Sequence, residues 1–338
     1  MKSIGDILET FPNGMTFKDD VVIVQSVDSI KIVYRTTDKI RTSVTFIAEF
    51  IKTLQGGITP DRYAEIFSSD ARIECLASLH SRNYLRSFTE GSCDRFSRQV
   101  AWQGNFTAVP YDAMNRLGAA KVMIVGCGGV GSIVASHLAR SGVRNFCLID
   151  YANVDLPDMN RQLTYFPKDI GKPKVDVLKQ YLEENFEAVC HKEHLMVDQS
   201  NVLEKLCEDY RPDMIINGAD EPIGKITTWI AHMSLKKKIP AMFGSLATEM
   251  GCVGPLLVSE RAKVEYIESC TSFLGDVLSA KCTSSICFTN SSIAVKVAFE
   301  IYKFLSGIHS PSSLDTTLVY DLMEDRLVGD IKWGVEGE

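Results

Sequence analysis

Residues 124–138 read IVGCGGVGSIVASHL, an apolar run that breaks into glycines and then resumes. The apolar residues before the glycines predict a buried strand, and those after them predict a buried helix. The glycines follow the pattern Gly-x-Gly-x-x-Gly at Gly126, Gly128 and Gly131, and Asp150 ends the next strand-like segment. This spacing is typical of a nucleotide site, because such glycines let the backbone approach a phosphate and the acid binds a ribose hydroxyl.

The glycine pattern by itself leaves the ligand open. NAD, FAD, S-adenosylmethionine and ATP all bind at such turns, and a tight turn that binds nothing is the alternative. The cations that follow favour ATP, since Arg161 comes just after the second strand-like segment and Lys174 begins a helical one. An enzyme that breaks ATP must neutralise a departing pyrophosphate, whereas a dehydrogenase needs little cationic chemistry at its diphosphate.

Strand-like and helix-like segments alternate from Lys121 onward. The predicted strands are 121–126, 145–150, 214–220 and 239–244, with helices after Gly131, from about Lys174 and near 226–235. Such alternation predicts an α/β fold, with a Rossmann-like, doubly wound and mostly parallel sheet covered by helices on both faces. Asp220 then falls at the carboxyl end of a strand, where open α/β sheets bind ligands. A helix N-cap before Pro222 is the alternative for this carboxylate.

The first 90 residues predict a separate small domain. Strand patterns at 21–24, 30–34 and 39–43 precede helical patterns at 44–54, from Thr59-Pro60 onward and at 73–80. This order resembles the winged-helix-like peptide-clamp domain of three strands and three helices that occurs in enzymes modifying ribosomally made peptides. In that family a leader peptide adds as an extra strand beside the third strand. A domain that only caps the dimer or the sheet is one alternative. A DNA-reading winged helix is another, but it would need a helix dense in Lys and Arg.

Composition limits the partners and the compartment. The chain has 338 residues, of which 45% are hydrophobic, and a net charge of −7. Two domains with their own cores are expected, while a general nucleic-acid or anionic-membrane surface is not. The ten cysteines include no C-x-x-C pair, and Asp6 and Glu9 stand where a signal peptide needs an apolar core. We therefore expect a cytoplasmic protein with reduced thiols.

Seven short motifs carry a more specific resemblance. They are RFSRQ at 95–99, GCGGVGS at 126–132, LID at 148–150, NRQ at 160–162, DIGKPK at 169–174, GAD at 218–220 and GCVGPLLV at 251–258. In this order they resemble the ubiquitin-activating, ThiF/MoeB-type adenylating family. With the clamp-like N-terminus, they are most similar to its peptide-modifying branches, the microcin-maturing MccB type and the pantocin-maturing PaaA type. The predicted organisation is a peptide-recognition domain over 1–90, a connector over 91–120 and an adenylating domain over 121–338.

The resemblance implies roles for individual residues. The nucleotide backbone would be held by Gly126, Gly128, Gly129 and Gly131. Asp150 would bind the ribose, and Arg161 and Lys174 would bind the triphosphate, with Lys174 nearest the reacting phosphorus. Asp220 would hold Mg²⁺ and help to orient the attack. Arg98 corresponds to an arginine that reaches the ATP of a neighbouring subunit, so a homodimer is expected. The alternative for Arg98, Arg161 and Lys174 is that they form surface ion pairs.

The chain departs from the family pattern at several positions. Many relatives bind a structural zinc through two C-x-x-C pairs, and the lack of such pairs predicts that no zinc is bound. Asp158 stands where the family usually has asparagine, and its charge would repel a triphosphate unless Mg²⁺ or a role as base compensates. Asn160 would then make the contact with the triphosphate in place of Asp158. Cys270, Cys282 and Cys287 lie near where thioester-forming relatives keep a catalytic cysteine, although ordinary thiols are the simpler interpretation.

These expectations together predict an ATP-dependent adenylating enzyme. A carboxylate of a ribosomally made precursor peptide, whose leader binds residues 1–90, would attack the α-phosphorus of MgATP and give an acyl adenylate and pyrophosphate. In a PaaA-like reaction an internal nucleophile then captures an activated glutamate and closes a ring, whereas an MccB-like reaction activates the C-terminal carboxylate. Adenylation of a ubiquitin-like sulfur carrier, an NAD-dependent oxidoreductase and a non-catalytic regulator are the other interpretations.

Overall fold

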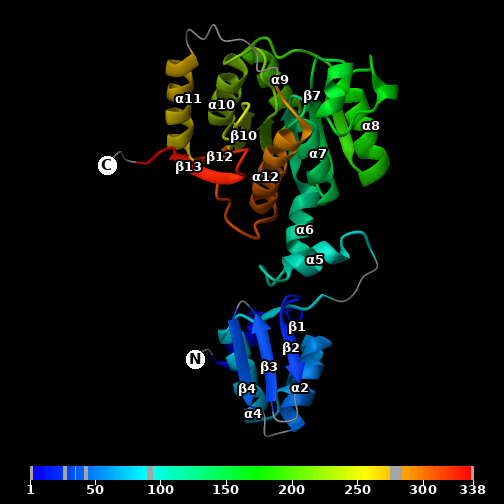
Figure 1. Ribbon diagram of the computed structural model, residues 1–338, viewed down its shortest axis with the longest axis vertical. Coiled ribbons are helices and arrows are strands. Elements are labelled where there is room, and N and C mark those ends of the chain that lie inside the picture. Colours follow the sequence, from blue (N-terminus) through cyan, green and yellow to red (C-terminus); the bar gives the residue numbers. More distant parts are fainter. Residues whose placement is uncertain are drawn as a thin grey trace. The chain divides into compact units, whose positions relative to one another are not determined.

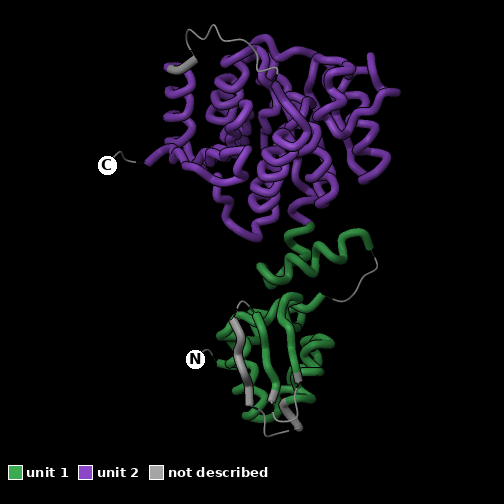
Figure 2. The backbone as a smooth tube through the Cα atoms, viewed as in Figure 1, with its two compact units in different colours: residues 1–114 green, residues 115–338 purple. Residues whose placement is uncertain are grey.

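The computed structural model describes residues 3–25, 29–34, 36–41, 45–89, 94–274 and 284–335. The chain divides into two compact units, residues 1–114 and residues 115–338 (Figure 2). This division falls inside the segment that the sequence predicts as a connector. Within the described ranges, no helix combines the length and the apolar character that a membrane crossing requires.

The second unit is built on an eight-stranded sheet with the order β13-β12-β11-β10-β9-β6-β7-β8 (Figure 1). The strands from β8 to β10 run parallel, and β11, β12 and β13 continue the sheet antiparallel. The chain starts in the middle at β6, goes to one edge and returns to the other side, which confirms the predicted doubly wound, mostly parallel sheet. The strands are β6 Lys121–Val125, β7 Asn145–Ile149, β8 Val189–Glu193, β9 Met214–Asn217, β10 Ala241–Leu246, β11 Met250–Leu257, β12 Thr316–Asp321 and β13 Arg326–Lys332.

Helices cover both faces of this sheet (Figure 1). On one face, helices α9, α10 and α11 pack on alternate strand residues such as Met123, Val125 and Cys147. On the other face lie α7, α8 and α12. Because β6 is covered on both faces, its sequence is a continuous apolar run and does not alternate. The helices are α7 Gly131–Arg140, α8 Lys174–Phe186, α9 Ser200–Tyr210, α10 Lys225–Lys237, α11 Glu260–Leu274 and α12 Cys287–Ser306.

The first unit contains a three-stranded antiparallel sheet, β2-β3-β4, and a separate antiparallel pair of β1 and β5. Its core includes Ile32, Leu54 and Leu79, all fully buried. Three strands followed by helices are present as predicted. The third strand begins at residue 36, before the predicted residue 39. Thr59 is the N-cap of a 3-10 helix, Pro60–Arg62, that runs directly into α3, Tyr63–Ile66. The sequence pattern does not predict α1, β1 and β5, because each is too short to show a period.

The elements of the first unit are α1 Ile4–Glu9, β1 Met15–Phe17, β2 Val22–Gln25, β3 Ser29–Tyr34, β4 Thr36–Arg41, α2 Thr45–Gln55, η1 Pro60–Arg62, α3 Tyr63–Ile66, α4 Asp70–Ser81, β5 Leu85–Ser87 and α5 Ser97–Gln103. Helix α6, Pro110–Ala119, crosses the division between the two units. Residues after β5 belong to this unit as well. The Ser87 hydroxyl, for example, donates to the Ala108 carbonyl at 3.0 Å.

Candidate functional site

The order of the strands reverses between β6 and β9, and the predicted site residues gather at this point. The glycine turn follows β6, Asp150 follows β7, and Asp220 lies three residues after the end of β9. These three strands are parallel neighbours, so their carboxyl ends meet at one edge of the sheet. Open α/β sheets bind their ligands at such a switch point. The fold therefore brings the predicted nucleotide residues of three separate segments to the same edge.

Two glycines of the turn serve the packing of the fold. Gly126 has a φ of +93°, and a Cβ there would lie 2.4 Å from the carbonyl carbon of Gly218. A Cβ on Gly131 would lie 1.9 Å from the carbonyl oxygen of Gly126. Since these obstacles are backbone atoms, they cannot rotate away. The two glycines allow β6, β9 and the start of α7 to come into contact.

Gly128 is different from its neighbours in the turn. A Cβ added to it would meet no atom of the described residues within 4 Å. Because packing does not require a glycine here, the position leaves open space beside the N-terminus of α7, where a helix dipole favours an anion. Of the predicted nucleotide glycines, Gly128 is the one whose environment fits a ligand best.

Two side chains hold the glycine turn in place. One oxygen of Asp150 accepts the backbone N–H of Cys127 at 2.6 Å, and the other accepts that of Ala152 at 2.7 Å. The Tyr165 hydroxyl donates to the Cys127 carbonyl at 2.6 Å. Burial raises the pKa of Tyr165 well above its usual value, so the hydroxyl stays protonated. Asp150 thus braces the turn, and its remaining lone pairs are available to a ribose hydroxyl.

We expect Tyr165→Phe to lower the free energy of unfolding by about 1–2 kcal/mol, because the buried Cys127 carbonyl loses its donor. Urea denaturation would show this as a lower midpoint with an unchanged slope. Tyr111→Phe is the matched control, since Tyr111 is 43% exposed. Equal midpoints for the Tyr165 and Tyr111 variants would show that the bond does not brace the turn.

The two predicted triphosphate cations converge on one buried carboxylate. Lys174 begins α8 and places its Nζ 3.0 Å from Asp158 Oδ2. Arg161 places its Nη2 3.5 Å from Asp158 Oδ1. The side chains of Lys174 and Asp158 are only 10% and 8% exposed. Both cations therefore form ion pairs, as the alternative interpretation expects. That interpretation expects the pairs on the surface, however, and the pair of Lys174 with Asp158 is buried.

This cluster of Asp158, Arg161 and Lys174 adjoins the glycine turn. A Cβ on Gly129 would lie 3.7 Å from Cγ of Arg161. The charge of Lys174 also acts on the Cys127 thiol, whose pKa is raised above all by burial and is lowered in part by this ammonium. Two cations beside the start of a helix are an arrangement that suits a phosphate chain.

The start of α12 covers the same region. Asn160 donates to the Ser285 carbonyl at 2.8 Å and accepts from Arg161 Nη1 at 3.2 Å. Asn290 is 4% exposed, and a Cβ on Gly129 would lie 2.2 Å from its Oδ1. A side chain at position 129 would therefore require the Asn290 side chain on α12 to move. Neither Tyr165 nor Asn290 is predicted as a site residue, because no spacing in the sequence links them to the turn.

Asp220 is exposed at the same edge of the sheet. Its interpretation as a helix N-cap is wrong, because Gly224 holds that position before α10. Next to it, Glu221 accepts the Tyr151 hydroxyl, and this hydrogen bond raises the pKa of Tyr151 to about 12. The described ranges contain no group of three His, Cys, Asp or Glu side chains that could hold a metal. Asp220 as a ligand of Mg²⁺ stays a prediction.

The remaining predicted residues lie in other places. Arg98 is exposed on α5 of the first unit, and its contact with a neighbouring subunit stays a prediction. Cys270 lies on α11, where burial raises its pKa and so disfavours the thiolate. Cys287 is the half-buried first residue of α12. Cys282 lies outside the described residues.

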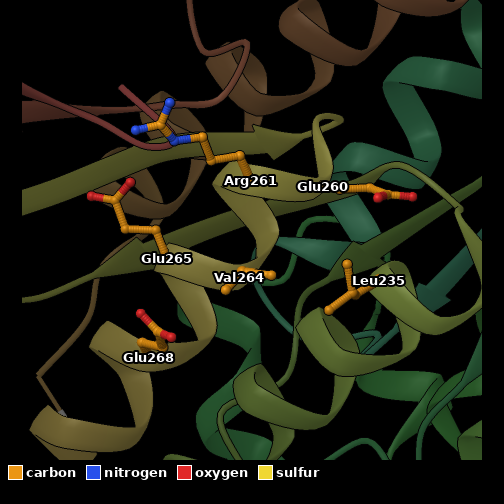
Figure 3. A pocket seen from close by; sticks show the side chains of 6 residues that line it. All are labelled: Leu235, Glu260, Arg261, Val264, Glu265 and Glu268. Atoms are coloured by element: carbon orange, nitrogen blue, oxygen red, sulfur yellow. The ribbon is translucent and has the colours of Figure 1, made fainter. Parts of the chain in front are cut away.

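A hollow of about 460 Å³ between α10 and α11 is separate from these residues (Figure 3). Its lining consists of Leu235, Glu260, Arg261, Val264, Glu265 and Glu268. None of the predicted nucleotide residues contributes to it, and three carboxylates would repel a triphosphate. One of them, Glu265, already accepts the Gly334 N–H at 2.5 Å. The hollow is therefore not the nucleotide site.

Comparison with solved structures shows where this fold occurs. The structure of Escherichia coli MccB with AMPCPP and the peptide MccA is similar with a TM-score of 0.76 and 21% identity, covering 96% of this chain and 98% of that one. PaaA is similar with a TM-score of 0.70 and 22% identity, covering 94% and 99%. At such identities the likeness shows a shared fold, and its coverage includes the small first unit.

Sequence comparison gives the family. "Adenylyltransferase and sulfurtransferase MOCS3" of Aedes aegypti is 28% identical over 177 residues, which are 52% of this chain and 38% of that protein. "tRNA threonylcarbamoyladenosine dehydratase" of Bacillus subtilis is 32% identical over 136 residues, 40% of this chain and 52% of that protein. The chain thus matches about half or less of the length of these relatives. The model of the ThiF family matches residues 96–333, which include the glycine turn and the cation cluster, and the chain therefore belongs to the ThiF family.

Proposed function

We propose that this protein is an ATP-dependent adenylating enzyme that activates a carboxylate of a ribosomally made precursor peptide. The observation that carries the proposal is the position of Lys174 and Arg161 beside the glycine turn at the switch point of the sheet. The adenylyltransferases among its relatives, and the MccB structure with a nucleotide analogue and a peptide, support the same chemistry. An enzyme that only transfers hydride has little use for these cations.

The residues of the site suit the transfer of an adenylyl group. The start of α7 and the open space at Gly128 would accommodate phosphate oxygens, and Asp150 would bind the ribose. A carboxylate oxygen of the peptide attacks the α-phosphorus, a new P–O bond forms, and the bond to pyrophosphate breaks. Lys174 and Arg161 neutralise the charge that develops on the phosphates. Asp220 would hold Mg²⁺, which supplies further positive charge to the same oxygens.

The first unit supports a peptide as the substrate. Its three-stranded sheet has β4 at one edge, and an edge strand offers unpaired backbone groups to an added strand. We propose that the leader of the precursor adds beside β4 and so brings the modified part to the second unit. We also propose that the enzyme acts as a cytoplasmic homodimer in which Arg98 of one protomer reaches the nucleotide of the other.

The finer proposal is that an activated glutamate side chain is captured within the peptide, as in the PaaA-like reaction. The acyl adenylate makes the carboxyl oxygen a leaving group, so an internal nucleophile expels AMP and closes a ring. The product then has the mass of the precursor minus one water. An MccB-like reaction would activate the C-terminal carboxylate, and the mass and position of the change separate the two.

The test uses the full chain, ATP, Mg²⁺ and the peptide encoded beside its gene. We expect exchange of labelled pyrophosphate into ATP that depends on the peptide, and a product that has lost water and carries no nucleotide. The same peptide without its leader half is expected to support much weaker exchange. Binding of NAD without any exchange would contradict the proposal and favour the oxidoreductase.

A further inference from the structure

Asp158 is surrounded by hydrogen-bond donors inside the cation cluster. Its oxygens accept from Lys174 Nζ at 3.0 Å, Gln162 Nε2 at 2.5 Å and the Asp155 N–H at 3.0 Å, with Arg161 Nη2 at 3.5 Å. A carboxylate has about four lone-pair positions, so these donors occupy them. Asp158 is 6% exposed, which leaves a substrate proton no free oxygen to reach. A role as general base does not suit this environment.

The negative charge of Asp158 stabilises the positive charges of Lys174 and Arg161. A buried ammonium needs a counter-ion or strong acceptors, because its hydration is lost on burial. Asp158 supplies that counter-ion to Lys174, and it is also the carboxylate partner of Arg161. A triphosphate that binds the same ammonium and guanidinium would come close to the Asp158 carboxylate and be repelled by it.

We infer that Asp158 is an internal counter-ion that competes with nucleotide phosphate for Lys174 and Arg161. The inference rests on the proposed function, since it requires ATP at this site. Asp158 acts through the two cations and is therefore a positioning residue. It keeps them in place before the nucleotide arrives, at the expense of affinity for ATP. Because Mg²⁺ reduces the charge of ATP, the repulsion is smaller for MgATP than for free ATP.

The experiment compares Asp158→Asn with the wild-type protein in calorimetric titrations with ATP, once with EDTA and once with Mg²⁺. Asparagine keeps the shape and can still accept the Asp155 N–H. We expect the variant to bind free ATP about tenfold more tightly, with a smaller gain for MgATP. We also expect ATP to raise its melting temperature more than that of the wild type, because the nucleotide then supplies the missing counter-ion to Lys174.

Asp155→Asn is the matched control. It removes one negative charge from the N-cap of the 3-10 helix Leu156–Asn160, which contains Asp158. The Asp155 carboxylate accepts the Leu156 N–H at 2.7 Å, and no ion pair with Lys174 or Arg161 is found for it among the described residues. We expect its affinity for ATP to stay within about twofold of the wild type. If Asp158→Asn does not fold, Asp158→Ser replaces it, because serine also removes the charge and offers an oxygen to the Asp155 N–H.

The outcomes separate the inference from the proposed function. A purely structural role for Asp158 would weaken ATP binding in the variant or leave it unchanged, and either result in EDTA would overturn the inference. A gain of equal size in the Asp155 and Asp158 variants would overturn it as well, because the effect would then belong to net charge. If neither the wild type nor any variant binds ATP, the proposed function itself is wrong.

Discussion

Lys174→Met is expected to lower ATP–pyrophosphate exchange by about a hundred- to a thousandfold. The ammonium of Lys174 is the buried cation of the cluster, and methionine keeps the length of the side chain while removing its charge. The loss is expected in the turnover of the bound nucleotide more than in its affinity, because charge on the phosphates increases in the transition state. Exchange rates at saturating ATP measure this directly.

The control for this variant is Lys172→Met. Lys172 lies two residues away, is 53% exposed in its side chain and pairs with Asp169, so its removal is expected to change exchange by less than about twofold. Equal losses of exchange in the two variants would mean that the net charge of the protein causes the loss, and not the position of Lys174.

Lys174→Met also leaves Asp158 without the nearer of its two cationic partners. Removing one member of a buried pair costs about 3–5 kcal/mol, and the remaining contact with Arg161 should reduce that figure. The double variant Lys174→Met/Asp158→Asn removes both charges, so we expect it to regain stability in urea denaturation but not exchange. Recovery of exchange in the double variant would show that stability, and not chemistry, limits the single one.

Gly131→Ala and Gly128→Ala are expected to separate folding from nucleotide binding. The Cβ of Gly131→Ala would lie 1.9 Å from a backbone oxygen, so we expect a loss of about 3 kcal/mol or more in the free energy of unfolding. The Cβ of Gly128→Ala meets open space, so its stability should stay within about 0.5 kcal/mol of the wild type. Urea denaturation distinguishes the two.

Binding of ATP provides the second part of this test. The methyl group of Gly128→Ala occupies space that we assign to the phosphates, and we expect its affinity for ATP in calorimetric titrations to fall about tenfold or more. A Gly128→Ala protein that folds and binds ATP like the wild type would show that the turn is a packing feature without a ligand. The Gly131 result alone cannot make this distinction, because a destabilised protein binds poorly for other reasons.

Much of the fold follows from local patterns in the sequence. The apolar residues of β6, the glycines and the first residues of α7 follow one another directly in the sequence. Their spacing therefore predicts a strand, a turn and a helix. The alternation of apolar strands with amphipathic helices predicts the parallel sheet, and the sheet places Asp150 and Asp220 at one edge. The short α1, β1 and β5 lack a periodic pattern, since their stability depends on the core of the first unit.

The site could be predicted only in part, because contacts between distant residues leave no regular spacing. Tyr165 reaches Cys127 across 38 positions of the chain, and Asn160 reaches Ser285 across 125. The surroundings of the four glycines of the turn also could not be predicted from the sequence. The sequence assigns all four to a ligand, which stays a prediction. Their surroundings add that a Cβ on Gly126 or Gly131 would meet backbone atoms and that one on Gly129 would meet Asn290.

The sequence by itself determined the α/β fold, the glycine turn and the residue types at the edge of the sheet, because period and spacing are properties of neighbouring residues. It also showed that Asp158 departs from the family pattern. Only the tertiary structure decided what that departure does, because the effect of a charge depends on burial and distance. Asp158 is buried and 3.0 Å from Lys174, so a carboxylate that the sequence marks as a repulsive element is also the partner of the cation.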